Sequence, residues 1–230
     1  MAGTLFIVAT PIGNLEDITF RAVRILSEVD LIAAEDTRHS KILLMKYQIN
    51  TPLTSYHKFN IKGKTPHLLE QLQLGKNIAL ISDSGMPGIS DPGQEIIKAA
   101  VEQNIRVEAI PGPSASLAAL AVSGLPTDRF LFLGFLPKKP GKKRKALERA
   151  LAEEGSLIIY ESPFRVVKTV REIHAIMGDR QIAVCRELTK KFEEVIRGTA
   201  GEVAEQLAAK NVKGEIVIVV SGQVTQRESN

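Results

Sequence analysis

The sequence alternates short apolar runs with loops rich in glycine, proline and aspartate and with amphipathic stretches. The apolar runs are typical of strands, and the amphipathic stretches carry apolar residues at helical spacing, as at Ala22, Ile25 and Val29. Strands that alternate with helices favour an α/β fold with a mostly parallel sheet. Runs such as LFIVA and IALIS are apolar at nearly every position, which is typical of strands covered by helices on both faces.

The first half of the chain is expected to contain strands separated by helices. The strands are expected at residues 5–9, 31–34, 51–56, 78–82 and 107–110. Helices are expected behind a cap at Asp17 or Thr19, after the loop at 35–38, at 66–74, from Pro92 behind a capping Asp91, and at 114–122.

The character of the sequence changes at the turn-rich segment SGLPTDR, residues 123–129. We therefore expect an N-terminal α/β domain at 1–122, a C-terminal α/β domain at 123–222 and a flexible tail at 223–230. The second domain is expected to contain the segment FLFLGFLP, a basic loop at 138–145, helices at 146–153, 164–177 and 202–209, and strands at 156–160, 181–186, 194–199 and 215–220. Because two of these strands follow one another without a helix, the sheet is expected to be mixed.

The composition limits the class of protein and the kinds of site that the chain is expected to have. The chain has 230 residues, of which 44% are hydrophobic and 24% charged, so it reads as a globular protein of one large or two small domains. A single cysteine, Cys185, excludes an internal disulfide, and the four histidines lack the spacing of a helical metal pair, so no metal is expected. No apolar stretch approaches the ~18 residues that cross a membrane, and the N-terminus has no basic leader. We expect a cytoplasmic protein with no membrane contact.

Four loops combine glycine or proline with small polar residues at the ends of expected strands. They are TPIGN at 10–14, EDTR at 35–38, SDSGMPGISDPG at 82–93 and PGPSA at 111–115. Ligands of open α/β sheets bind at the carboxyl ends of the strands, where such loops lie. The loops could also be ordinary turns. The signatures GxxxxGK[ST], GxGxxG after the first strand and GxSxG are absent, which weighs against an ATPase, a Rossmann dehydrogenase and an α/β hydrolase.

The motifs TPIGNLEDIT, AEDTRHS, SDSGMPGISDPG, IPGPSA, YESPFR and GEIVIVVSG occur in this order. Together they resemble the S-adenosylmethionine-dependent methyltransferases of the tetrapyrrole-methylase superfamily, and within it the branch that methylates the ribose 2′-hydroxyl of a cytidine in 16S (small-subunit) ribosomal RNA. The resemblance extends from Gly3 to Gly222. It implies two α/β domains with S-adenosylmethionine in the cleft between them, and a homodimer.

The resemblance also implies the residues that bind the methyl donor. They are Thr10, Pro11, Asp83, Met86, Ser114, Ala115, Leu133, Ser162, Gly214 and Ile216. Asp83 can accept hydrogen bonds from a ribose or an amino group, or it can cap amides of its own loop. Two departures from the family pattern are visible. Lys58, Phe59 and Ile61 occupy a stretch that is often richer in histidine and acidic residues, and many members continue past GEIVIVVSG into a small helical extension.

Transfer of a methyl group to a ribose hydroxyl needs in-line positioning and removal of the hydroxyl proton, with no obligatory metal. The candidate catalytic residues are Glu35, Asp36, Arg38, His57 and Glu161. Each has a structural alternative. Glu35 to Arg38 can form a local ion pair and helix cap, Glu161 can pair with Arg165 one helical turn later, and His57 can be a partly buried structural residue.

The segment from Lys138 to Arg149 contains seven Lys or Arg and one Glu. Positive charge is therefore much denser in this segment than the net charge of +4 for the whole chain indicates. Contact with RNA phosphates explains such a cluster, and a solvated helix start is the alternative. The candidate RNA-binding residues are Lys138, Lys139, Lys142, Lys143, Arg144, Lys145 and Arg165. The expected partner is small-subunit ribosomal RNA, with no DNA. A small-tetrapyrrole methyltransferase and a non-catalytic RNA-binding protein remain as alternatives.

Overall fold

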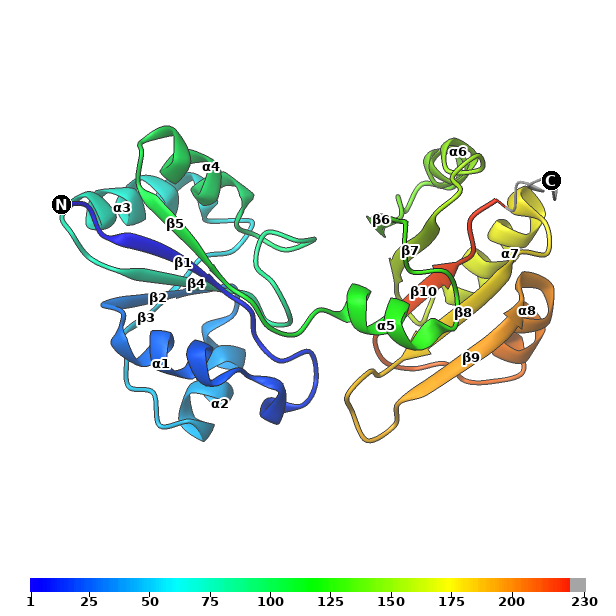
Figure 1. Ribbon diagram of the computed structural model, residues 1–230, viewed down its shortest axis with the longest axis horizontal. Helices are drawn as coiled ribbons and strands as arrows, with labels where there is room; N and C mark the ends of the chain where they lie inside the picture. The colour runs from blue at the N-terminus through cyan, green and yellow to red at the C-terminus, as the bar shows by residue number, and fades with distance from the viewer. Residues whose placement is uncertain (224–230) are drawn as a thin grey trace. The chain divides into compact units, whose positions relative to one another are not determined.

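The computed structural model describes residues 1–223 and separates into two compact units, Met1–Ser114 and Ala115–Asn230 (Figure 1). We call them unit 1 and unit 2. Except for Gln223, the tail expected at 223–230 lies outside the described residues. The division falls at the start of the helix α5 (Ala115–Ser123), whereas the sequence places it at the end of the same helix.

Unit 1 is built on a sheet of five strands that is fully parallel, where the sequence predicts a mostly parallel one. Its strands are β1 (Thr4–Val8), β2 (Leu31–Ala34), β3 (Leu53–Ser55), β4 (Ile78–Ile81) and β5 (Arg106–Ile110). Their order in the sheet is β3-β2-β4-β1-β5. Parallel strands all end at the same edge of the sheet, so the loops that follow them lie along one edge.

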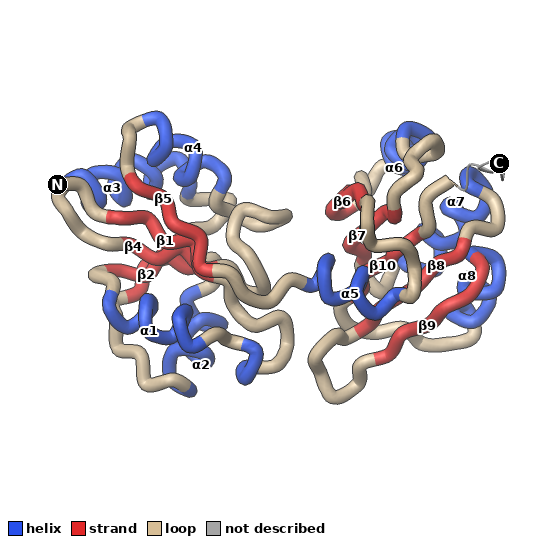
Figure 2. Tube along the Cα trace, in the orientation of Figure 1, coloured by secondary structure: helices blue, strands red, loops and turns tan. Residues whose placement is uncertain are grey.

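Helices cover both faces of this sheet (Figure 2). They are α1 (Phe20–Glu28), α2 (Thr37–Lys46), α3 (Ile61–Gln73) and α4 (Gln94–Glu102), with a short 3₁₀ helix at Leu15–Asp17. One core packs α1 and α2 against the sheet and a second packs α3 and α4 against the opposite face. Successive strand residues point to opposite faces, so the strands supply apolar side chains to both cores, which is why they are apolar at nearly every position.

Two helix starts differ from the sequence prediction. Helix α4 begins at Gln94 with Gly93 as its N-cap, not at Pro92 behind Asp91. Gly93 has φ +151°, and a Cβ there would lie 3.0 Å from both Leu80 Cδ2 and Gly88 N, so this N-cap position requires glycine. Helix α3 begins at Ile61 and contains Pro66, which was expected near its first turn. Thr19 caps α1, since its Oγ1 accepts a hydrogen bond from Ala22 N at 3.1 Å.

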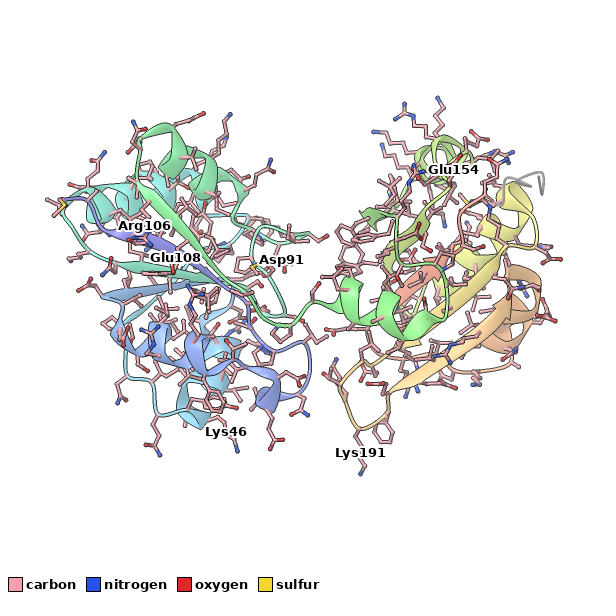
Figure 3. The ribbon with its side chains drawn as sticks, in the orientation of Figure 1. Lys46, Asp91, Arg106, Glu108, Glu154 and Lys191 are labelled. Carbon is pink, nitrogen blue, oxygen red and sulfur yellow. The ribbon has the colours of Figure 1, made fainter. Side chains whose placement is uncertain are left out.

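The outer strand β5 carries charged side chains, which discourages pairing with another chain. Arg106 and Glu108 lie beside one another on it (Figure 3), with Nη2 and Oε2 2.7 Å apart, and Glu108 also pairs with Arg21 of α1.

Unit 2 contains a mixed sheet, again as predicted. Its strands are β6 (Phe130–Phe135), β7 (Ser156–Glu161), β8 (Gln181–Arg186), β9 (Glu194–Thr199) and β10 (Ile216–Val220), in the order β6-β7-β10-β8-β9. β6 and β7 are parallel, and the other neighbours are antiparallel. Its helices besides α5 are α6 (Pro140–Arg149), α7 (Val166–Met177) and α8 (Ala200–Ala208).

Helices α6, α7 and α8 share the main core of unit 2 with one face of the sheet. Helix α5 packs against β10, β8 and β7, where Cys185 is fully buried and its thiol approaches Ala119 O at 3.8 Å. This packing explains why α5 belongs to unit 2. Burial raises the pKa of the Cys185 thiol to about 11, so the residue is a packing group and not a nucleophile at neutral pH. Over residues 1–223, every helix is too short or too polar to cross a bilayer.

Candidate functional site

The predicted site residues of unit 1 lie at the carboxyl edge of its sheet. Thr10 follows β1, Glu35 and Asp36 follow β2, His57 follows β3, and Asp83 follows β4. Ser114 follows β5 and closes the unit, while Ala115 begins α5. Register explains the adjacency of the β2 and β3 ends: Ala34 pairs with Ser55, and Tyr56 N donates to Ala34 O at 2.7 Å. The parallel sheet therefore gathers residues that are far apart in the sequence.

Thr10 ties the loop after β1 to the loop after β4. Its backbone exchanges two hydrogen bonds with Gly85, at 2.9 and 3.1 Å, and its hydroxyl donates to Ser82 O at 3.0 Å. Gly85 has φ +79°, a conformation that favours glycine. The Thr10 hydroxyl therefore helps to hold the two loops together. Pro11 and Asp83 are the residues next to these hydrogen bonds in the two loops.

Asp83 binds the backbone of the neighbouring strand end. Its Oδ1 accepts a hydrogen bond from Asp36 N at 3.1 Å. Among the described residues no donor binds its second oxygen. The carboxylate can therefore orient the loop after β2 with one oxygen and accept a hydrogen bond from a ligand with the other.

Glu35 and Asp36 are adjacent in sequence but have opposite electrostatic environments. Burial raises the pKa of Glu35, the nearby Asp83 carboxylate raises it further, and the Lys58 ammonium partly opposes this effect. Hydrogen bonds from Arg38 hold the pKa of Asp36 far below its usual range. Glu35 is consequently the stronger base of the two.

Asp36 has a structural role at the start of α2. It is the N-cap of α2: its Oδ1 accepts from Arg38 N at 2.8 Å, and its Oδ2 pairs with Arg38 Nη2 at 2.7 Å. The Arg38 side chain nevertheless remains 90% exposed, so its guanidinium is open to an anion.

His57 is partly buried beside these groups. Its backbone N–H donates to Asn60 Oδ1 at 2.9 Å, and its ring meets Phe59 edge-to-face with the centroids 6.1 Å apart. The buried Nδ1 finds no hydrogen-bond partner within residues 1–223. A buried polar atom without a partner costs stability, so this nitrogen is a group that the fold itself leaves unsatisfied.

A small hollow of about 60 Å³ lies beside Thr10, Pro11 and Asp83. Its remaining walls include residues that the sequence did not single out, Leu15, His39, Ser40, Ser82 and two apolar residues of α2. His39 and Ser40 lie in the first turn of α2 and end the motif AEDTRHS, which the sequence points to as a whole without a role for either residue.

The predicted site residues of unit 2 lie on several of its elements. Leu133 is in β6, Ser162 follows β7, and Gly214 and Ile216 lie at the start of β10. Gly214 has φ +91°, and a Cβ there would lie 2.4 Å from the Glu187 carboxyl, so only glycine fits. Ile216 is buried in the core and pairs with both neighbouring strands, opposite Glu161 of β7 and Arg186 of β8. Met86 of unit 1 packs on the core between the sheet and α3–α4.

Glu161 belongs to a buried network and is not placed as a base. Its side chain is fully buried, its Oε1 accepts from Arg165 Nε at 2.7 Å, and its Oε2 accepts from Thr169 Oγ1 at 2.7 Å. The structural alternative of an ion pair one turn apart is therefore the one observed. Arg165 is three-quarters buried and paired with Glu161, so it is not one of the exposed cations.

The basic segment is helical, and one of its lysines faces inward. Helix α6 begins at Pro140, a favoured first helical residue, so most of the expected loop at 138–145 is helix. Lys143 is 4% exposed, and its Nζ lies 2.8 Å from Glu172 Oε2 and 3.2 Å from Thr169 Oγ1. The prediction that Lys143 contacts RNA is wrong. The exposed cations of the segment are Lys138, Lys139, Lys142, Arg144, Lys145 and Arg149.

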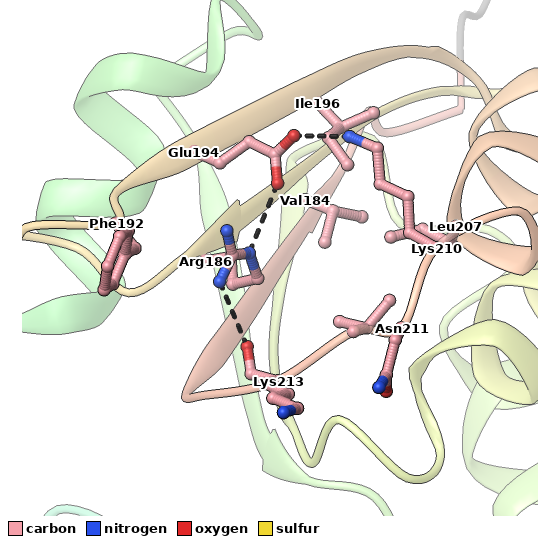
Figure 4. Close-up of a pocket in the computed structure, with 10 residues that line it drawn as sticks. Val184, Arg186, Phe192, Glu194, Ile196, Leu207, Lys210, Asn211 and Lys213 are labelled. Atoms are coloured by element: carbon pink, nitrogen blue, oxygen red, sulfur yellow. Dashed lines mark hydrogen bonds and ion pairs between the residues drawn. The ribbon is translucent and has the colours of Figure 1, made fainter.

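A pocket of about 240 Å³ in unit 2 contains none of the predicted site residues (Figure 4). Glu194 accepts hydrogen bonds from Arg186 and Lys210 across it, and Arg186 also donates to Lys213 O at 3.3 Å. These polar groups are largely satisfied by one another. Within the described part of the chain, no cluster of His, Cys, Asp or Glu is arranged to hold a metal.

The chain is similar to proteins of known function over nearly its whole length. It is 49% identical to "Ribosomal RNA small subunit methyltransferase I" of Halalkalibacterium halodurans over 96% of this chain and 76% of that protein. The protein of the same name from Thermotoga maritima is 47% identical, over 96% of this chain and 99% of its own length. The one from Synechocystis is 50% identical, over 96% and 79%.

Solved structures show the same fold at low sequence identity. A cobalt precorrin-4 methyltransferase matches 95% of this chain and 94% of its own with a TM-score of 0.68 and 16% identity. A diphthine synthase matches 96% and 91% with a TM-score of 0.71 and 14% identity.

A family model described as Tetrapyrrole (Corrin/Porphyrin) Methylases matches residues 4–204, which spans both units. The family uses S-adenosylmethionine as its methyl donor. The parallel sheet of unit 1, the mixed sheet of unit 2 and the order of the motifs agree with this match. The chain belongs to the tetrapyrrole methylase family.

Proposed function

We propose that the protein transfers the methyl group of S-adenosylmethionine to the 2′-hydroxyl of a cytidine ribose in small-subunit ribosomal RNA. The observation that carries this proposal is the identity of 47–50% over 96% of the chain with three ribosomal RNA small subunit methyltransferases. We further propose that it acts in the cytoplasm as a homodimer and has no DNA substrate.

The residues at the carboxyl edge of unit 1 fit the methyl donor. Asp83 has one oxygen without a hydrogen-bond donor among the described residues, as a ribose hydroxyl or the amino group of the donor would require. Gly112 lets its loop approach β1 closely, since a Cβ there would lie 2.9 Å from Ala9 Cβ. We propose that the donor-binding residues are Thr10, Pro11, Asp83, Met86, Ser114 and Ala115, together with Leu133, Ser162, Gly214 and Ile216.

The bound donor supplies a methyl group on a positively charged sulfur, which is already activated for transfer. The protein must then hold the ribose oxygen in line with it and accept the hydroxyl proton. We assign the proton to Glu35, because its raised pKa makes it a better base than Asp36. His57 and Arg38 are proposed to bind the substrate beside it.

The exposed side of α6 supports an RNA substrate. Lys138, Lys139, Lys142, Arg144 and Lys145 are exposed, and among the described groups only Arg144 has an ion-pair partner, Glu148. A cluster of unpaired cations suits a chain of phosphates. The solved structures whose titles name a tetrapyrrole share only 16–18% identity with this chain. A non-catalytic RNA-binding protein would not need the Glu35–Asp83 arrangement.

A methyl-transfer assay tests the substrate class. Small ribosomal subunits from cells lacking the endogenous enzyme, naked small-subunit RNA, duplex DNA and a porphyrinogen are each incubated with radiolabelled S-adenosylmethionine. Label is expected in subunits or naked RNA alone. Label in the porphyrinogen alone would contradict the proposal, and so would the absence of label from every substrate while calorimetry shows that the donor binds.

A further inference from the structure

An exposed aromatic side chain lies at the carboxyl edge of unit 1 among positive charges. Phe59 follows β3 and is 85% exposed, and neither core of the unit includes it. Lys58 Nζ lies 5.0 Å from the centre of its ring. From His57 to Leu69 the sequence contains Lys58, Lys62 and Lys64 but no acidic residue. The surface thus combines an open aromatic face with cations.

The ring is carried by a fixed loop. Asn60 Nδ2 donates to Ser55 O at 3.2 Å and to Ser55 Oγ at 3.1 Å, while Asn60 Oδ1 accepts from His57 N at 2.9 Å. Asn60 N also donates to His57 O at 2.8 Å. These bonds close a tight turn around Phe59, so little conformational entropy is lost when a ligand binds to the ring.

This turn adjoins the proposed base. β3 pairs with β2 through Ser55 and Ala34, the residue before Glu35. The Lys58 charge acts on Glu35, since it lowers the pKa that burial and Asp83 raise. The aromatic face therefore lies in the neighbourhood where the ribose of the substrate must be held.

An aromatic face beside a cation matches two parts of a nucleotide. Bases stack on aromatic rings, and lysine ammonium groups contact the phosphates that follow them. We propose that Phe59 stacks on a base of the RNA substrate next to the modified ribose, and that Lys58 contacts the adjoining phosphate. This inference rests on the proposed function and adds to it a residue that positions the substrate strand.

The chain contains no tryptophan, which permits a direct test. Phe59→Trp introduces a single indole fluorophore at the proposed stacking position. Its emission is expected to be quenched on titration with small ribosomal subunits or their naked RNA, whichever the wild-type enzyme methylates. Phe20→Trp is the matched control, because Phe20 is 98% exposed in the same unit and has no lysine beside its ring among the described contacts. Equal quenching at both positions would overturn the proposal.

Binding measurements with three further variants test the chemistry of the contact. Phe59→Leu keeps an apolar side chain without an aromatic face, and its affinity for the RNA should fall about 5- to 150-fold, which is ~1–3 kcal/mol per stacked base at 1.4 kcal/mol per tenfold. Phe59→Tyr should bind nearly as the wild type does. Lys58→Gln should reduce the salt dependence of binding by about one phosphate contact.

Donor binding measured by calorimetry separates stacking from other roles of Phe59. The affinity for S-adenosylmethionine should be unchanged in Phe59→Leu. An unchanged RNA affinity in Phe59→Leu, or an equal loss of donor and RNA affinity, would overturn the stacking proposal. If the wild-type enzyme neither binds nor methylates the RNA, the proposed function itself fails, and this result is distinct from a failure of Phe59 alone.

Discussion

At the scale of single residues, the site separates two adjacent carboxylates by their environments. Glu35 is partly buried and lies near the charge of Asp83, whereas Asp36, also partly buried, caps α2 and pairs with Arg38. The sequence suggests both residues as bases, because both are carboxylates that directly follow an expected strand. Only the fold shows which of the two has its carboxylate already engaged.

Replacement of Glu35 tests its assignment as the base. Glu35→Gln should lower kcat about 10²- to 10⁴-fold, the range typical of general base catalysis, with donor affinity retained. Asp36→Asn should lower kcat less and should change stability by at most about 1 kcal/mol, because asparagine also caps helices well and only the exposed ion pair with Arg38 is lost. Single-turnover methylation rates and donor calorimetry measure these effects. Full activity of Glu35→Gln would exclude it as the base.

The pH dependence of the reaction follows from the same residue. The transfer needs ionised Glu35, so kcat should fall as the pH drops through its pKa, which lies above the usual 4.5. Asp36 cannot cause this acid limb, because its pKa is held far below its usual range. Rates measured from pH 4.5 to 8 on pre-bound substrate should show the limb in Asp36→Asn as in the wild type. A wild-type profile that is flat down to pH 4.5 would contradict the assignment.

At the scale of elements, the fold of α6 and of the loop after β4 determines what individual residues do. The sequence motifs alone do not indicate these roles. Lys143 lies in a run of basic residues, but its position on α6 is one turn before Leu147, which packs in the core. It therefore faces α7 and pairs with Glu172. Local composition cannot distinguish this lysine from its neighbours, because the distinction arises from which face of the helix is covered.

Two neighbouring lysines of α6 should therefore behave differently. Lys143→Ala leaves Glu172 partly buried without its partner, and should lower the free energy of unfolding by about 3 kcal/mol, near the lower end for a buried pair because Glu172 is a quarter exposed. Lys142→Ala should change it by less than about 0.5 kcal/mol and instead reduce the salt dependence of RNA binding. Urea denaturation and binding titrations at several salt concentrations measure both. Equal effects of the two substitutions on stability would refute the inward orientation of Lys143.

The loop after β4 depends on one glycine. Gly85→Ala places a side chain at φ +79° and should destabilise unit 1 by about 1–2 kcal/mol while weakening donor binding. Gly63→Ala is the matched control, because Gly63 lies within α3 with open space around it and should stabilise the unit by about 0.5–1 kcal/mol. Thermal unfolding of both variants should shift in opposite directions. A shift of the same sign would contradict the role given to the Gly85 turn.

At the scale of the whole molecule, the alternation of strands and helices predicted the fold class because covered parallel strands must be apolar on both faces. The mixed sheet of unit 2 was also predictable, since β8 and β9 follow one another without a helix. The exact start of α4 and the attachment of α5 to unit 2 depend on contacts at Gly93 and Cys185 that no local pattern reveals. The grouping of site residues at one sheet edge was predictable, whereas the pairing of Glu161 with Arg165 was one of two readings that only the packing decides.

The position of the methyl group that the enzyme adds tests the proposed reaction most directly. Small ribosomal subunits lacking the modification are treated with the wild-type protein and S-adenosylmethionine, and the RNA is digested to nucleosides for mass spectrometry. One new methylated cytidine is expected, with a fragmentation pattern that places the added mass on the ribose, and none is expected with Glu35→Gln on the same timescale. A methyl group on the base, or an equal yield from the Glu35→Gln variant, would contradict the proposed reaction.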